Sequence, residues 1–196
     1  MTQTDLPGRF VAHLEQLAAR QDLGALAALR RGLGGQPAAL AGMFPYVVPW
    51  LPRGAPIWQE DLYYQVAALF ALRLQSWPAD VSGARDFGAS FARLAQAGPS
   101  EESIERRFVA LLACHIEELP DQLRHAVSLM RAHSVPVDWA QLIRDAQGWT
   151  WESRAVQRRW ARSFWGQAAA APVDSTPAPS EAALSEPASS EIEEED

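Results

Sequence analysis

Four arginines near the end of the chain are spaced for binding negatively charged groups. Arg154, Arg158 and Arg162 recur every fourth residue and therefore share one side of a helix, with Arg159 beside them. No acidic residue stands among them, although an exposed helix face usually mixes both signs because i,i+4 ion pairs stabilise it. Guanidinium groups in this pattern suit nucleic-acid phosphates or the carboxylates of an acidic protein.

A simpler explanation covers part of this pattern. Cations close to the C-terminal end of a helix stabilise the helix dipole, and Arg158, Arg159 and Arg162 occupy the later turns of the segment. The dipole does not require an unbroken set of arginines without an acidic neighbour. The sequence therefore predicts a surface for a nucleic-acid backbone or for an acidic protein partner.

The helix that positions these arginines is predicted over residues 153–166. Thr150 or Ser153 can cap its start, and Gly166 suits its end. Its other side carries large apolar residues at helical spacing, which are Val156, Trp160 and Phe164. We therefore expect one face to be anchored in the core while the opposite face presents the arginines.

Helical periodicity extends through most of the chain and predicts an all-α fold. Apolar residues recur at helical spacing in segments that include 7–21, 23–33, 59–75, 87–96 and 138–148, in a helix that Ser100 can cap, and in one that begins at Pro120 and is ended by Pro136. Residues 37–50 contain Pro45 and Pro49, so a short helix followed by a broken segment is expected there. We expect about eight or nine helices in two packed bundles, residues 1–97 and 98–167.

Residues 168–196 differ in composition from the rest of the chain. They contain 8 acidic residues and no basic ones, whereas residues 1–167 contain 16 acidic residues and all 17 basic residues, every one an arginine. This segment is rich in Ala, Pro, Ser and Glu and cannot bury enough apolar surface to offset its ordering entropy, so a disordered acidic tail is predicted. The formal net charge of −7 thus conceals a nearly neutral folded part.

Several functional classes find no support in the residues. The four histidines, His13, His115, His125 and His133, have no metal-ligand spacing with a carboxylate or cysteine, and the single Cys114 excludes an internal disulfide. No glycine-rich loop follows a predicted strand, no apolar run approaches the ~20 residues of a membrane helix, and the start lacks a signal-peptide pattern. We therefore expect a cytoplasmic protein without a catalytic site, metal, cofactor or membrane partner.

Five stretches, taken in order, resemble a known family. They are ALAALRRG (Ala25–Gly32), DLYYQVAALFAL (Asp61–Leu72), FGASFARLAQ (Phe87–Gln96), SIERRFVALLACHIEELPDQLRHAVSLMRAHSVPVDWAQLIRD (Ser103–Asp145) and VQRRWARSFW (Val156–Trp165). Their order and spacing resemble CasB-type proteins, the small subunit of the type I-E Cascade CRISPR surveillance complex. The resemblance covers residues 8–166 and leaves the acidic tail outside it.

The resemblance implies a non-catalytic, nucleic-acid-binding subunit that acts in antiviral defence. In that family two copies associate beside the guide RNA, contact other Cascade subunits and help to stabilise the R-loop, including the target or displaced DNA strand. By resemblance, the nucleic-acid-binding residues are Arg30, Arg31, Arg107, Arg124, Arg131, Arg158, Arg159 and Arg162.

Two alternatives stay open at this point. One is a structural helical adaptor whose arginines bind acidic protein partners. The other is an enzyme with dispersed catalytic residues, for which nothing in the sequence argues. Without the resemblance, Arg30 and Arg31 are explained as contacts to the C-terminal end of a helix dipole. Arg106 is explained as an ion-pair partner of Glu102, four residues earlier.

Overall fold

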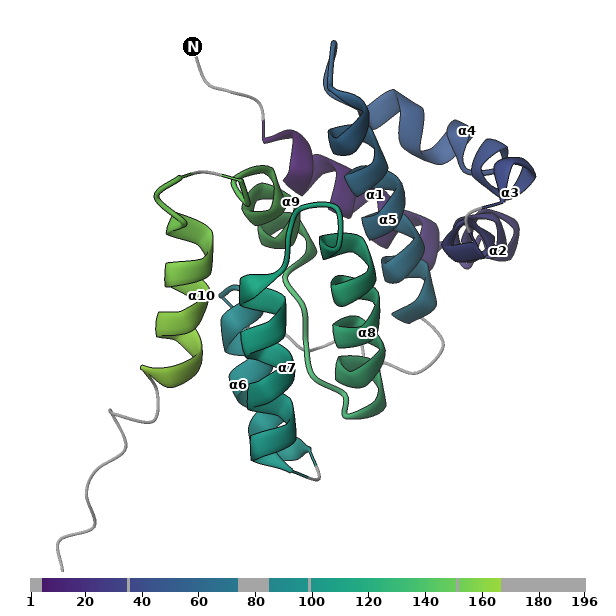
Figure 1. Ribbon diagram of the computed structural model, residues 1–196. Helices are drawn as coiled ribbons and strands as arrows, with labels where there is room; N and C mark the ends of the chain where they lie inside the picture. Colours follow the sequence, from purple (N-terminus) through teal and green to yellow (C-terminus); the bar gives the residue numbers. More distant parts are fainter. Residues whose placement is uncertain (1–4, 35, 74–84, 99, 151, 167–196) are drawn as a thin grey trace, which may run out of the picture.

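The chain folds into helices throughout the residues that the structure describes (Figure 1). This computed structural model describes residues 5–34, 36–73, 85–98, 100–150 and 152–166. Within them the α-helices are α1 (Leu6–Ala19), α2 (Leu23–Arg31), α3 (Pro37–Ala41), α4 (Phe44–Val47), α5 (Ile57–Arg73), α6 (Phe87–Ala97), α7 (Glu101–Ala113), α8 (Leu119–Ala132), α9 (Trp139–Gln147) and α10 (Ala155–Trp165). Two 3-10 helices, η1 (Gly32–Gly34) and η2 (Val48–Trp50), complete them.

The all-α prediction is confirmed, and the segment with two prolines contributes more helices than expected. Residues 37–50 form α3, α4 and η2, because Pro45 and Pro49 each take an early helical position where the missing N–H costs nothing. None of the described helices is long and apolar enough to cross a membrane. The predicted tail, residues 168–196, lies outside the described residues.

Short polar side chains set the starts of five helices by accepting a hydrogen bond from a backbone N–H in the first turn. The bonds run from Gly8 N to Asp5 Oδ1, Ala25 N to Asp22 Oδ1, Ala89 N to Asp86 Oδ1, Ser103 N to Ser100 Oγ and Gln141 N to Asp138 Oδ1. Asp22, Ser100 and Asp138 are thus the N-caps of α2, α7 and α9.

The start of α10 is different, and the predicted cap at Thr150 or Ser153 is wrong. The residue before the helix is Arg154, which has a left-handed backbone (φ 49°) and makes no side-chain cap. A contact with a distant carbonyl and a side-chain bond across the turn hold it instead. Arg154 donates to the Leu112 carbonyl, and Gln157 Nε2 donates to the Trp149 carbonyl at 2.8 Å.

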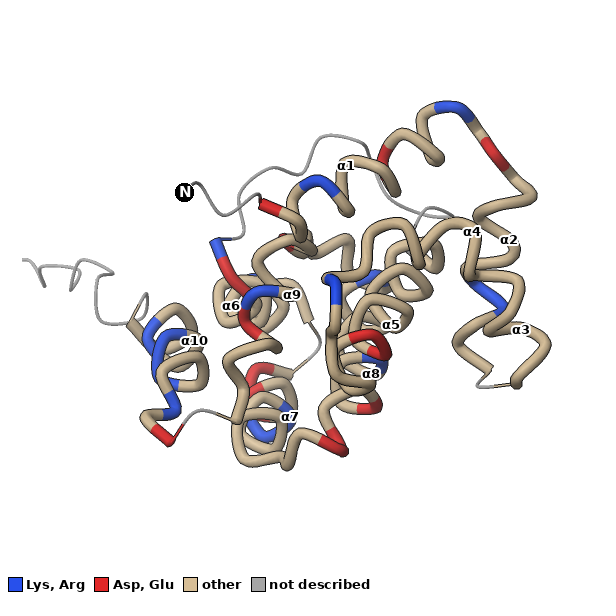
Figure 2. Tube along the Cα trace, turned by 90° about the horizontal axis from the view of Figure 1, so that it is seen from above, with Lys and Arg blue, Asp and Glu red and all other residues tan. Residues whose placement is uncertain are grey.

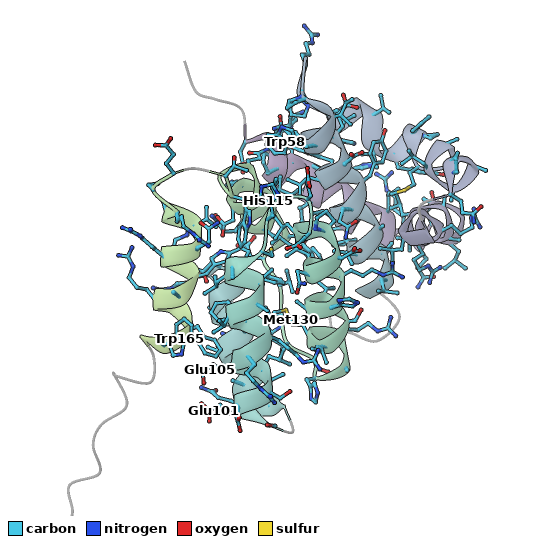
Figure 3. The ribbon with its side chains drawn as sticks, viewed as in Figure 1. Trp58, Glu101, Glu105, His115, Met130 and Trp165 are labelled. Atoms are coloured by element: carbon cyan, nitrogen blue, oxygen red, sulfur yellow. The ribbon has the colours of Figure 1, made fainter. Side chains whose placement is uncertain are left out.

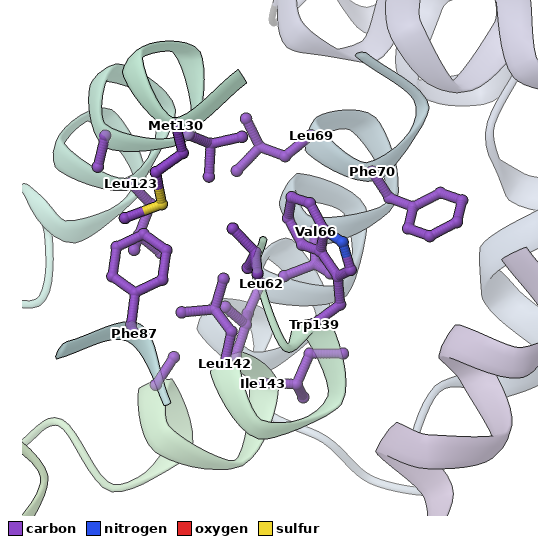
Figure 4. Close-up of a cluster of buried hydrophobic side chains, with 14 of the residues drawn as sticks. Leu62, Val66, Leu69, Phe70, Phe87, Leu123, Met130, Trp139, Leu142 and Ile143 are labelled. Atoms are coloured by element: carbon purple, nitrogen blue, oxygen red, sulfur yellow. The ribbon is translucent and has the colours of Figure 1, made fainter. Parts of the chain in front are cut away.

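The buried apolar side chains form one continuous cluster that both halves of the chain supply. Figure 4 shows Leu62 and Val66 from α5 close to Trp139 and Ile143 from α9, within a cluster that α6 and α8 also enter. Helix α1 packs on α9, and α6 packs on α7, α8 and α10. The division into bundles of residues 1–97 and 98–167 stays a prediction.

A glycine allows the close packing of α6 on α10, the helix that carries the predicted arginine surface. A Cβ atom added at Gly88 would lie 2.1 Å from the Trp160 carbonyl oxygen. Beside this contact, Ser163 Oγ donates to Asp86 Oδ2 at 2.7 Å. The position of α10 is therefore fixed against α6 by backbone proximity and by a hydrogen bond.

Candidate nucleic-acid interface

Helix α10 is anchored by the residues that the sequence predicts. Val156, Trp160 and Phe164 are all buried. The Trp160 ring lies 5.2 Å from that of Phe87 and 5.1 Å from that of Trp149, measured between centroids. These contacts fix the rotation of the helix about its axis, so the residues on its opposite side must face outward.

A buried carboxylate adds a polar connection between α9 and α10. The Asp145 side chain is 1% exposed and accepts hydrogen bonds from Trp160 Nε1 at 2.5 Å and from Gln141 Nε2 at 2.6 Å. It also pairs with the Arg159 guanidinium. Burial raises the pKa of Asp145, although the hydrogen bonds and the nearby arginine act in the opposite direction.

This network divides the four arginines of the predicted surface. Arg154 and Arg159 are engaged within the molecule, with the Leu112 carbonyl and with Asp145. Arg158 and Arg162 are exposed and, among the described residues, have no ion-pair partner; Arg162 Nε donates only to the Arg158 carbonyl, at 3.3 Å. Figure 2 shows basic residues in succession along α10.

Two further predicted arginines, Arg124 and Arg131, connect α8 to backbone carbonyls of η1 and α5. Arg124 donates to the Leu33 carbonyl at 3.4 Å. Leu33 follows Arg31 by two residues, and Arg31 itself is exposed at the end of α2. Arg131 donates to the Leu72 carbonyl at 3.3 Å, in the last turn of α5. These guanidinium groups satisfy carbonyls that helix ends leave unpaired.

The remaining predicted arginines lie apart from both groups. Arg30 is half-buried and its Nε donates to the Leu26 carbonyl within α2, at 3.2 Å. Arg107 is exposed on α7, where it lines a hollow of about 90 Å³ with Gln122 and His125. The eight predicted residues therefore do not form one site. They comprise the exposed pair on α10, Arg159 paired with Asp145, two residues on α8 that donate to carbonyls of η1 and α5, and isolated positions.

The described residues hold no group of three or more His, Cys, Asp or Glu side chains that could bind a metal ion. One residue that matters for the surface, Asp145, was not predicted from the sequence. What the arrangement offers is electrostatic: two free guanidinium groups, one helical turn apart, on a helix that cannot rotate. Such groups can contact successive phosphates without reading bases.

Comparison with known proteins identifies relatives along most of the chain. A family model described as CRISPR-associated protein Cse2 matches residues 25–165. A CRISPR-associated protein Cse2 from Thermus thermophilus is 35% identical over 169 residues, which cover 83% of this chain and 92% of the relative. These findings confirm the resemblance drawn from the sequence.

Solved structures agree with the sequence comparison. The crystal structure of CasB from M. ruber is 32% identical, with a TM-score of 0.69, and the match covers 84% of this chain and 95% of that one. A chain in a CRISPR RNA-guided surveillance complex in a pre-nicking state is 26% identical, with a TM-score of 0.70 and coverages of 85% and 97%. The fold described above is thus similar to that of CasB proteins.

Proposed function

This chain belongs to the Cse2 family of CRISPR-associated proteins, and from that premise we propose that it is a non-catalytic, nucleic-acid-binding small subunit of a type I-E CRISPR surveillance complex. A related chain is part of an RNA-guided surveillance complex. The proposed partners are other subunits of that complex, a second copy of this chain, the guide RNA, and the target or displaced DNA strand. The proposed setting is antiviral defence in the cytoplasm.

The proposed mechanism is stabilisation of the R-loop through the nucleic-acid backbone. Pairing between guide and target supplies sequence specificity, and opening the DNA duplex is nearly balanced in free energy, so modest protein contacts with the backbone can favour the open state. A subunit with this task needs exposed, fixed positive charges and no base-reading side chains. Arg158 and Arg162 are such charges.

One observation carries the proposal most directly. Helix α10 presents two exposed guanidinium groups that no described carboxylate neutralises, while the same helix is fixed by a buried face and by Asp145. Arginines that served only the helix dipole would not need this rigid support. The nearly neutral folded part makes long-range attraction weak, so we expect weak, sequence-independent binding by the isolated subunit.

The test compares two double variants that remove the same charge from different places. R158A/R162A removes the exposed pair, and R20A/R53A is the matched control, because both of its arginines are exposed and lie outside the predicted set. Affinity for single-stranded DNA of several sequences is measured across salt concentrations. We expect the first variant to lose affinity equally for every sequence, and its salt slope to fall by up to ~0.7 per lost contact.

The same pair of variants separates the proposal from a purely structural adaptor. If R158A/R162A binds DNA like the control but no longer joins the surveillance complex, the two arginines contact acidic protein instead. If it joins the complex but supports fewer R-loops, with guide RNA still loaded, the backbone-binding mechanism stands.

A further inference from the structure

A hollow of about 300 Å³ lies between the first half of α5 and the start of α8 with the segment that precedes it, and Ala146 of α9 also lines it. Its floor is apolar and includes Leu62, Leu119 and Leu123, all buried side chains. Gln65 Nε2 on α5 donates to the Pro120 carbonyl at 2.8 Å, which ties the two walls together. The hollow is therefore formed before anything binds, and its volume lies at the lower end of the roughly 300–1,000 Å³ of ligand pockets.

The rim of this hollow combines an exposed aromatic with negative charge. Trp58 is 46% exposed at the rim, and its neighbour Ile57 is 78% exposed. Figure 3 labels Trp58 on α5 and His115, in the segment that joins α7 to α8, both in the upper half of the view. Asp61 and Glu117 also line the hollow, and no arginine is among its lining residues.

From this combination we propose that the hollow is a docking site for another protein subunit, which inserts one large apolar side chain flanked by Arg or Lys. The two carboxylates complement such flanking cations and repel a phosphate backbone, so nucleic acid is a poor occupant. Exposed tryptophan at the edge of an apolar pocket is typical of the residues that dominate protein interfaces. The inference rests on the proposed function only for the identity of the partner.

The chemistry of the site is tested on the full-length protein without any partner subunit. The probes are short synthetic peptides with a central Leu, Met or Phe flanked by two Arg, and the same peptides flanked by two Glu. Binding is followed by NMR at the indole N–H of Trp58, which is assigned with W58F. We expect Arg-flanked peptides to shift this signal and to bind about tenfold or more tightly than Glu-flanked peptides. Equal binding, or none by the Arg-flanked set, would overturn the inference.

Variants then test the site in the assembly. W58A and D61R/E117R are expected to associate about tenfold or more weakly with surveillance complexes prepared without this subunit. F44A and E15R/E102R are the matched controls, with an exposed aromatic and exposed carboxylates elsewhere on the molecule. W58A should keep the single-stranded DNA affinity of the unmodified protein, which separates this site from the arginines of α10. Association of W58A and D61R/E117R at control levels would contradict the proposal.

A photo-crosslinking residue at position 58 identifies the occupant. We expect it to attach to another subunit of the complex, at an apolar residue within one or two positions of Arg or Lys. A crosslink to guide RNA, to DNA or to a second copy of this chain would identify a different occupant and would overturn the proposal.

Discussion

The Trp160 indole N–H donates a hydrogen bond to Asp145 Oδ2 at 2.5 Å, and both side chains are buried. This bond connects α10 to α9 in the interior, while Arg159 reaches the other oxygen of the same carboxylate from outside. A buried carboxylate is costly unless donors surround it. Asp145 therefore determines both how α10 sits and which of its arginines remain available.

The first prediction concerns pH and follows from the raised pKa of Asp145. A carboxyl whose pKa is higher in the folded than in the unfolded state contributes stability below its unfolded pKa. It loses that contribution as pH rises through the folded pKa. D145N lacks this titration. The unmodified protein should lose stability as pH rises from 3.5 towards 6, whereas D145N should not. We therefore expect the free energy of unfolding of D145N, minus that of the unmodified protein, to increase over this range.

Urea denaturation at several pH values measures this difference. D121N is the control, because it removes an exposed carboxyl elsewhere on the molecule. A D145N difference that moves in the opposite direction would show that the three donors outweigh burial and hold the pKa of Asp145 below its ordinary value.

The second prediction concerns the contact between α6 and α10. In G88A the new methyl group would meet the Trp160 carbonyl oxygen, because the Cβ position lies 2.1 Å from it. The helices must separate, and overpacking of this kind costs about 1–3 kcal/mol. G34A is the control, since a Cβ there meets nothing within 4 Å. Urea denaturation should show a lower free energy of unfolding for G88A, with G34A close to the unmodified protein.

The fold was predictable from the sequence where local patterns decide structure. The burial of Val156, Trp160 and Phe164 and the caps at Asp22 and Ser100 follow from helical spacing and from short polar side chains before helices. The start of α10 was not predictable in this way, because a contact between Arg154 and the distant Leu112 carbonyl is present there rather than a local cap.

The candidate site was predictable only in part, for the same reason. Arg159 follows Asp145 by 14 positions, so their pairing depends on the angle between α9 and α10. One signal was available: Asp145 lies between Leu142 and Ala146 on an apolar stripe, where a charged residue requires a partner. A carboxylate on that stripe predicts hydrogen-bond donors from a neighbouring helix.

The third prediction concerns the acidic segment of residues 168–196, which holds 8 acidic and no basic residues. As a polyanion it would compete with phosphates for the exposed arginines, and its removal changes the net charge from −7 to about +1. We expect deletion to raise the affinity for single-stranded DNA at low salt, and this gain to disappear at high salt. A scrambled tail of the same composition should behave like the native one. An unchanged affinity after deletion would exclude competition by the tail.

The last prediction separates the arginines of α10 by their roles. Arg159 neutralises Asp145, whereas Arg158 and Arg162 are free of described carboxylates. R159A leaves a buried acceptor without one of its donors, so we expect a loss of about 1–3 kcal/mol in the free energy of unfolding. Because the Arg159 charge is already paired, R159A should change the salt slope of single-stranded DNA binding less than R158A or R162A does.

A double-mutant cycle between R159A and D145N measures the pairing itself. The two losses of stability should be smaller together than their sum, because each variant removes the same interaction. R158A with D145N should be additive, since these residues share no contact among the described residues. If R159A keeps full stability and lowers DNA affinity and salt slope as strongly as R158A, then Arg159 binds phosphate, and the surface on α10 is the wider one that the sequence predicts.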